Sequence, residues 1–190
     1  VKTDGKTVGL PFNVEGYGFV YNKKVFREAG IDATSLTTYA KLQAAVKKID
    51  SMKTKLGIKG VFALPGKEAW IMSDHLANLY IGQDFKGNAL KLYNSKTMPF
   101  TKNADMKQML DLQSTYSIKP VMQMDYSAQV NQYFSQGKTA MIQQGDWIYP
   151  TVEQIDKKFA KNDVGMIPIP VKGEEGKLPV GTSLYWSCLL

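Results

Sequence analysis

The stretch Gly5-Lys-Thr-Val-Gly-Leu-Pro-Phe-Asn-Val-Glu-Gly-Tyr-Gly-Phe-Val-Tyr-Asn-Lys-Lys-Val-Phe26 is the most informative part of this 190-residue chain. It predicts two short extended runs, at 8–12 and 17–21, separated by a polar gap that contains Glu15. A helix is expected next, because the Asn22 side chain can accept a hydrogen bond from a free first-turn N–H and Gly30 can end the helix in the left-handed conformation. A carboxylate in such a gap is either exposed or holds hydroxyl or cationic groups.

Beyond this stretch, predicted helices and strands alternate along the chain. Apolar residues at steps of three and four predict helices over 38–56, 68–81, 103–116 and 125–136, and another one after Gly145. Shorter apolar runs predict strands at 59–64, 90–93, 139–143 and 164–169, and an extended apolar end over 178–190. Such alternation is typical of the α/β class.

The composition excludes several classes of function. The net charge is +7, but Arg27 is the single arginine and the lysines are scattered, so we expect a solvated surface and no nucleic-acid partner. No run of about 18 apolar residues predicts a membrane-spanning helix. One cysteine, Cys188, and one histidine, His75, cannot form an internal disulfide, a CxxC zinc site or a histidine-rich metal site. We therefore expect no metal and no cofactor.

Four segments carry a family resemblance. The segment 5–26 resembles the lobe-crossing segment of the sugar-binding proteins of ABC transporters, the maltose-binding-protein-like extracellular solute-binding family. The segment 38–42 is similar to that family's "W-x-E/D-F/L" helix start, with Tyr39 in place of the tryptophan. The segment 134–147 resembles its "F-x-x-G-K-A-A-M…G-x-W" run, and 163–181 resembles its "D-x-G-x-x-P-x-P…G" run.

The resemblance implies a fold and a domain organisation. Family members are about twice as long and have two lobes of the type II periplasmic-binding-protein fold, each a mixed sheet flanked by helices and joined by hinge strands. Their crossings correspond here to the Glu15 and Gly181 segments. We therefore expect residues 1–190 to form the second lobe alone, with hinge-strand stubs at about 5–16 and 178–188. The first lobe would lie outside this sequence.

The resemblance also implies a function. It predicts an extracellular receptor that binds a sugar or oligosaccharide between its lobes and delivers it to the permease subunits of an ABC transporter, without enzymatic activity. We expect a monomer at the extracellular face of the cell membrane or in the periplasm. Any export leader, and any lipid anchor that attaches it to the membrane, would lie outside this sequence.

Aromatic side chains are the first candidates for the binding site, because the C–H faces of sugars pack on flat rings. Trp147 matches the family's stacking tryptophan at a helix start, although it could instead belong to the core. Trp70, on the 68–81 helix, is open to the same two interpretations. Of Tyr185 and Trp186, one is expected to line the cleft, since neighbouring strand residues face opposite ways, and we favour Trp186.

Polar candidates would bind the sugar hydroxyl groups. Glu15 matches a hydroxyl-binding glutamate of the maltose-binding branch, or it is an exposed hinge carboxylate. Asp146 could accept from a hydroxyl group or cap the helix that follows it. Asn13 and Gln144 are candidate amide contacts. By contrast, Asp74 and His75 are predicted to lie one helical face too far from Trp70, and His75 is expected to be an ordinary helix histidine with its hydrogen bonds satisfied.

Two alternatives stay open. One is a receptor of the same fold for a peptide, a polyamine or an iron complex, and the ten tyrosines are compatible with an iron complex. The other is a glycosidase, which needs two carboxylates across a cleft, such as Glu15 and Asp146. Titration of tryptophan fluorescence with oligosaccharides would distinguish the receptors, whereas turnover of an aryl glycoside would indicate the enzyme.

Overall fold

The computed structural model describes residues 2–3, 5–7, 13–173 and 180–183. Within them, five strands form a mixed sheet in the order β4-β5-β3-β6, and β7 pairs with β3 outside this path. The strands are β3 (Asn13–Asn22), β4 (Gly60–Phe62), β5 (Thr139–Gly145), β6 (Val164–Ile167) and β7 (Val180–Ser183). A separate antiparallel pair consists of β1 (Lys2–Thr3) and β2 (Lys6–Thr7). Among the described strands of the larger sheet, only β4 and β5 pair in parallel.

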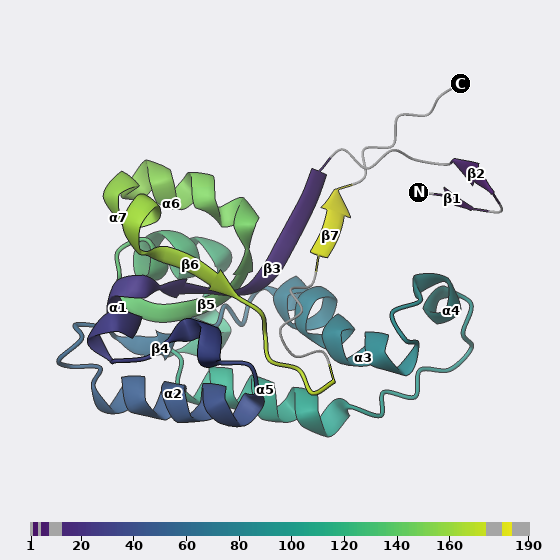
Figure 1. The fold of residues 1–190 in the computed structure, drawn as a ribbon, viewed down its shortest axis with the longest axis horizontal. Coiled ribbons are helices and arrows are strands. Elements are labelled where there is room, and N and C mark those ends of the chain that lie inside the picture. Colours follow the sequence, from purple (N-terminus) through teal and green to yellow (C-terminus); the bar gives the residue numbers. More distant parts are fainter. Residues whose placement is uncertain (1, 4, 8–12, 174–179, 184–190) are drawn as a thin grey trace.

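Helices cover both faces of the sheet (Figure 1), with α2 and α5 on one side and α6 and α7 on the other. The α-helices are α1 (Lys23–Glu28), α2 (Tyr39–Ser51), α3 (Asn78–Asp84), α4 (Ala89–Tyr93), α5 (Asn103–Thr115), α6 (Tyr149–Ile155) and α7 (Lys157–Asp163). Short 3₁₀ turns are η1 (Ala33–Ser35), η3 (Val121–Gln123) and η5 (Asp146–Ile148), and π-helical turns are η2 (Ile71–Ala77) and η4 (Ala128–Phe134). The expected α/β class, with a mixed sheet flanked by helices, is confirmed.

The core lies on both sides of β3. Phe19 and Val20 are both buried, and they belong to different clusters because side chains alternate between the faces of a strand. Phe19 shares its cluster with Leu42 of α2 and Met109 of α5. Val20 shares the other cluster with Phe134 of η4. The second half of β3 is therefore held firmly between two helical layers.

The predicted polar gap around Glu15 is wrong, because residues 13–22 form one continuous strand. Residues 13–16 pair with β7, where Glu15 lies opposite Gly181, and residues 17–21 pair with β5. Asparagine and glycine have weak strand preferences, and here pairing with a segment far along the chain overrides them. The run at 8–12 lies outside the described residues. The two segments that resemble the family's crossings thus pair with each other and extend together away from the helices (Figure 1).

Of three other local predictions, two are confirmed and one is wrong. The Asn22 cap is confirmed, since its Oδ1 accepts from the N–H groups of Lys24 and Val25 at 3.0 and 3.2 Å. Gly30 follows α1 with a φ of 61°, as expected for a residue that ends a helix. The strand predicted at 90–93 is wrong: these residues belong to α4, which Asn88 caps by accepting from the N–H of Lys91 at 3.0 Å.

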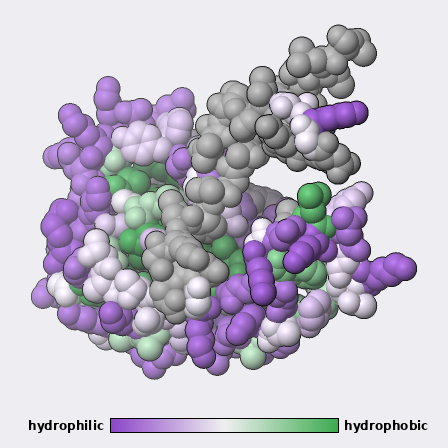
Figure 2. Space-filling view, turned by 45° about the vertical axis from the view of Figure 1, so that its right-hand side comes forward, coloured by the Kyte–Doolittle hydropathy of each residue, from purple (hydrophilic) through white to green (hydrophobic). Residues whose placement is uncertain are grey.

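Hydrophilic residues cover most of the face shown in Figure 2, and hydrophobic residues lie mainly in the recesses between them. A few large apolar side chains are exposed, among them Leu90, Tyr93 and Met98 on and after α4. In the part of the chain that the structure describes, no helix is long and apolar enough to cross a membrane.

Candidate functional site

Five half-buried rings form a contiguous group at the end of β5. This aromatic cluster consists of Tyr17, Trp70, His75, Tyr126 and Trp147. The imidazole of His75 lies among the others, stacked on Tyr17 at a centroid distance of 4.4 Å, edge-on to Trp70 at 4.9 Å and tilted against Trp147 at 5.2 Å. The two indoles are 6.4 Å apart. Burial raises the pKa of both tyrosines, so their hydroxyl groups stay neutral hydrogen-bonding groups.

Trp147 is placed by the end of β5. Gly145 is the last residue of that strand and lies opposite Tyr17 of β3. The indole folds back over Gly145, where an added Cβ would lie 1.9 Å from its Cζ3 atom. Trp147 is half-buried, so it is not enclosed by the core as the alternative interpretation required. Gly145 is therefore part of the site, because any side chain there would displace the ring.

Two buried glutamines fix the orientation of the Trp147 ring. Its Nε1 donates to Oε1 of Gln144 at 3.0 Å, and Nε2 of Gln144 donates to Oε1 of Gln129 at 2.7 Å. Nε2 of Gln129 in turn donates to the carbonyl of Ala63 at 2.8 Å. Both glutamines are completely buried, so the expectation that Gln144 contacts a ligand is wrong. This glutamine relay, Gln129 and Gln144, instead supports Trp147 from inside the protein.

One carboxylate connects the second indole to the neighbouring tyrosine. Glu68 accepts from Nε1 of Trp70 at 3.0 Å through Oε2, and from the backbone N–H of Tyr126 at 2.9 Å through Oε1. Trp70 is half-buried and faces Trp147, so it belongs to the aromatic cluster rather than to the enclosed core. The structure thus brings together the two tryptophans that the sequence proposed.

His75 joins the aromatic cluster because of a π-helical turn. Five residues span about 500° in an α-helix, which would leave Trp70 and His75 about 140° apart. Trp70 directly precedes η2 as its N-cap, and because the bonding pattern of this turn connects residues five apart, Trp70 and His75 lie closer to one face. Gln143 of β5 donates to the carbonyl of Ile71, the first residue of η2, at 2.7 Å. The prediction that His75 lies too far from Trp70 is therefore wrong.

The imidazole of His75 has an unusual environment. Its Nδ1 is enclosed and has no hydrogen-bond partner among the residues that the structure describes, so the expectation of a satisfied histidine is wrong as well. Burial lowers the pKa of His75, and the carboxylate of Asp74 partly opposes this effect. The ring is accordingly held in its neutral form.

The remaining candidates are placed less completely. Glu15 is half-buried and lies two residues before Tyr17 on β3, so both side chains leave the same face of the strand. Asp146 is exposed and makes no capping bond at the start of η5 or α6, which removes the capping alternative. Asn13 lies opposite Ser183 in the β3–β7 pair. Tyr185 and Trp186 lie outside the described residues.

Sequence reasoning missed Tyr17, Tyr126 and His75. For Tyr17 a usable signal existed, since it shares a strand face with Glu15. Tyr126 and His75 reach the aromatic cluster through a contact with Glu68 and through a π-helical turn, respectively. Neither of these features has a sequence pattern of its own.

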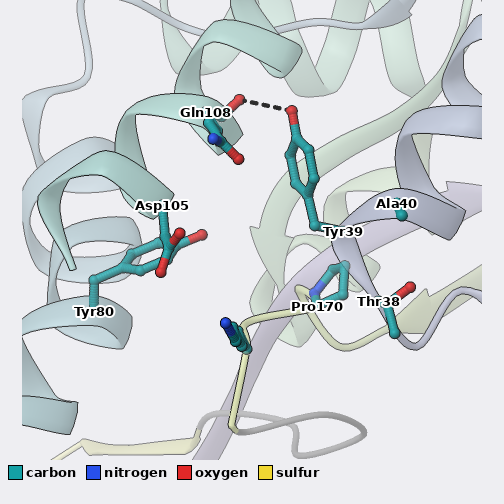
Figure 3. A pocket seen from close by; sticks show the side chains of 8 residues that line it. Thr38, Tyr39, Ala40, Tyr80, Asp105, Gln108 and Pro170 are labelled. Atoms are coloured by element: carbon teal, nitrogen blue, oxygen red, sulfur yellow. Dashed lines mark hydrogen bonds between the residues drawn. The ribbon is translucent and has the colours of Figure 1, made fainter.

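A hollow of about 330 Å³ lies between the start of α2, α3, α5 and the segment after β6 (Figure 3). In it, the hydroxyl group of Tyr39 donates to the carbonyl of Gln108 at 3.3 Å. Burial and the nearby carboxylate of Asp105 raise the pKa of Tyr80. None of the eight side chains drawn there belongs to the aromatic cluster, so this hollow is separate from the candidate site. Among the described residues, no group of three or more His, Cys, Asp or Glu side chains is arranged to hold a metal ion.

Comparison with known proteins identifies the relatives of this chain. Residues 1–188 match the family model of bacterial extracellular solute-binding proteins. The chain belongs to that family. The resemblance on which the sequence prediction depended is thereby confirmed. A comparison with curated protein sequences gives no match.

Solved structures agree on the fold of this solute-binding protein. A chitin oligosaccharide binding protein superposes with a TM-score of 0.69 at 25% identity, over 96% of this chain and 45% of its own. A manno-oligosaccharide specific solute binding protein of Bifidobacterium animalis subsp. lactis, solved with mannotriose, superposes with a TM-score of 0.65 at 27% identity, over 95% of this chain and 44% of its own. RafE of Streptococcus pneumoniae, in its apo form, superposes with a TM-score of 0.69 at 21% identity, over 96% of this chain and 48% of its own. At this identity it shows the fold alone. The chain thus spans less than half the length of these proteins.

Proposed function

We propose that this chain is the sugar-binding second lobe of an ABC-transporter receptor, which holds a sugar or oligosaccharide between two lobes and delivers it to the permease subunits. The observation that carries the proposal is the aromatic cluster, in which two fixed indoles remain half-exposed. A sugar presents C–H faces that pack on such rings and hydroxyl groups that bind carboxylates and amides. Glu15, on the same strand face as Tyr17, would supply one such carboxylate.

The named relatives support a carbohydrate rather than another solute. The chitin oligosaccharide binding protein and the manno-oligosaccharide binding protein are 25% and 27% identical to this chain, respectively. We infer a location at the extracellular face of the membrane or in the periplasm, as a monomer held at the membrane by a lipid anchor outside this sequence. Transport, rather than hydrolysis, is the proposed role.

The pairing of β3 with β7 supports the two-lobe organisation. Residues 13–16 and 180–183 run side by side and extend away from the helices, as two hinge strands would. The matched proteins are more than twice as long as the aligned region. The first lobe would continue from these strands and close over the aromatic cluster, since ligands of two-domain proteins bind at the boundary between the domains.

Calorimetry on the full-length receptor tests the proposal. We expect saturable binding of at least one sugar from a panel of mannobiose, mannotriose, chitobiose and raffinose, together with a change in tryptophan emission from Trp70 and Trp147. A peptide, a polyamine and a ferric siderophore serve as the competing solutes. Binding of one of these but of no sugar would overturn the proposal, and turnover of an aryl glycoside would favour the glycosidase alternative.

A further inference from the structure

His75 occupies a place in the aromatic cluster that packing alone does not explain. Three rings surround its imidazole within 5.2 Å, and a phenylalanine or leucine could make the same apolar contacts. Instead the site contains a side chain with two nitrogens, and the residues described in the structure provide no hydrogen-bond partner for the enclosed one. An enclosed polar atom without a partner costs stability, so its presence points to a role for the rest of the ring.

The position of the imidazole proton follows from this geometry. A neutral imidazole has one N–H donor and one acceptor nitrogen. If the proton were on the enclosed Nδ1, a donor would be buried without an acceptor. The favoured tautomer therefore carries its proton on Nε2, which, among the described residues, is not one of the enclosed atoms without a partner. His75 thus offers an N–H donor next to Tyr17 and the two indoles.

We propose that His75 is a specificity-determining contact, whose Nε2–H donates to one oxygen of the sugar residue that packs on Trp147. This inference rests on the proposed function and extends it. Stacking on an indole tolerates many sugars, because every pyranose has a C–H face. A fixed donor beside that indole distinguishes sugars by whether they place an oxygen within its reach. Loss of a hydrogen bond that a site is built to make is what separates close analogues.

The test uses the full-length receptor and whichever of mannotriose or chitobiose it binds more tightly. His75→Phe keeps a ring for stacking but removes the donor, and His75→Gln keeps an N–H donor. We expect His75→Phe to raise Kd about three- to tenfold and His75→Gln to raise it less. Ser73→Ala, at an exposed residue of the same helix, is the matched control and should leave Kd unchanged. Melting temperatures without sugar verify that each variant is folded.

Monodeoxy derivatives of the same sugar distinguish a hydrogen bond from His75 from a purely structural role of its ring. If His75 donates to one oxygen, removing that oxygen weakens wild-type binding but has no further effect in His75→Phe, so the two losses are not additive at one position. A purely structural role predicts equal losses in both proteins at every position. Wild-type affinity in His75→Phe, or additivity throughout, would overturn the role of His75 while leaving sugar binding intact. If the wild-type receptor binds no sugar at all, the proposed function fails and this inference fails with it.

Discussion

Gly145 and Trp147 are fitted to each other, since a Cβ on Gly145 would lie 1.9 Å from Cζ3 of the Trp147 indole. Gly145→Ala should therefore displace the ring while leaving the strand intact, because the backbone at Gly145 is extended and accepts any residue. We expect weaker sugar binding by the full-length receptor and a shifted tryptophan emission spectrum. Gly82→Ala is the control, as a Cβ there meets nothing within 4 Å. Unchanged affinity in Gly145→Ala would argue against Trp147 as a stacking surface.

Truncation of the indole itself should have a larger effect. In the full-length receptor we expect Trp147→Ala to cost about 2 kcal/mol of binding free energy or more, as is typical of a central aromatic contact. That corresponds to an increase in Kd of roughly thirtyfold. Calorimetry on both proteins measures it, with melting temperatures to verify folding. A loss below about twofold would mean that the sugar packs elsewhere.

The glutamine relay predicts a loss of stability as well. Gln129→Leu removes the acceptor of the buried Gln144 Nε2, and an unsatisfied buried donor costs about 1–3 kcal/mol. Chemical denaturation should show a reduction of this size in the free energy of unfolding. Gln132→Leu, at an exposed position of the same helix, should change it little. Equal stability of the two variants would show that Gln144 finds another acceptor.

The pH dependence of stability follows from His75. Because burial lowers the pKa of His75 in the folded state, the unfolded chain binds the proton more readily. Its contribution is therefore fully present above the ordinary histidine pKa of about 6.5 and is lost as the pH falls through the lower folded value. His75 is the single histidine of these 190 residues. Between pH 7.5 and 5, the melting temperature of the wild type should fall more than that of His75→Phe, and parallel curves would contradict the enclosed environment of the ring.

One lobe without its partner should bind poorly. A closed two-lobe receptor contacts its ligand from both sides, and one lobe keeps only part of those contacts while still immobilising the sugar. A loss of about 4 kcal/mol would raise Kd roughly a thousandfold. Calorimetry of the 190-residue chain and of the full-length receptor in one buffer compares them directly. Equally tight binding by both would show that the site lies wholly within this chain.

Local rules predicted much of the fold from the sequence. Asn22 caps the start of α1 and Gly30 follows its end, as expected, because capping depends on a few neighbouring atoms. The rule failed at 90–93, where apolar residues are exposed on a capped helix rather than buried in a strand. It failed again at Glu15, where pairing with β7 makes a strand out of residues that favour turns. In that case the decisive partner lies far away along the chain.

In the candidate site, too, predictions from residue type and position succeeded, whereas features that depend on the folded structure were not predicted. Trp147 and Trp70 were predicted from residue type and position, and both lie in the aromatic cluster. An α-helical spacing separates His75 from Trp70, whereas η2 is π-helical. The sequence indicates Gln144 only as a candidate amide contact next to Trp147. It is buried, and its amide donates to Gln129, which no local pattern connects to it.

The pairing along β3 has a mechanical consequence. This strand is anchored in the sheet over residues 17–22 and projects from it over residues 13–16, without a loop between the two parts. Because the strand is held at residues 17–22, a small rotation there produces a larger displacement at its other end, near Asn13. Tyr17, which stacks on His75, lies where β3 leaves the sheet. We expect a tilt of the backbone at Tyr17 to be amplified at Asn13, the far end of the strand.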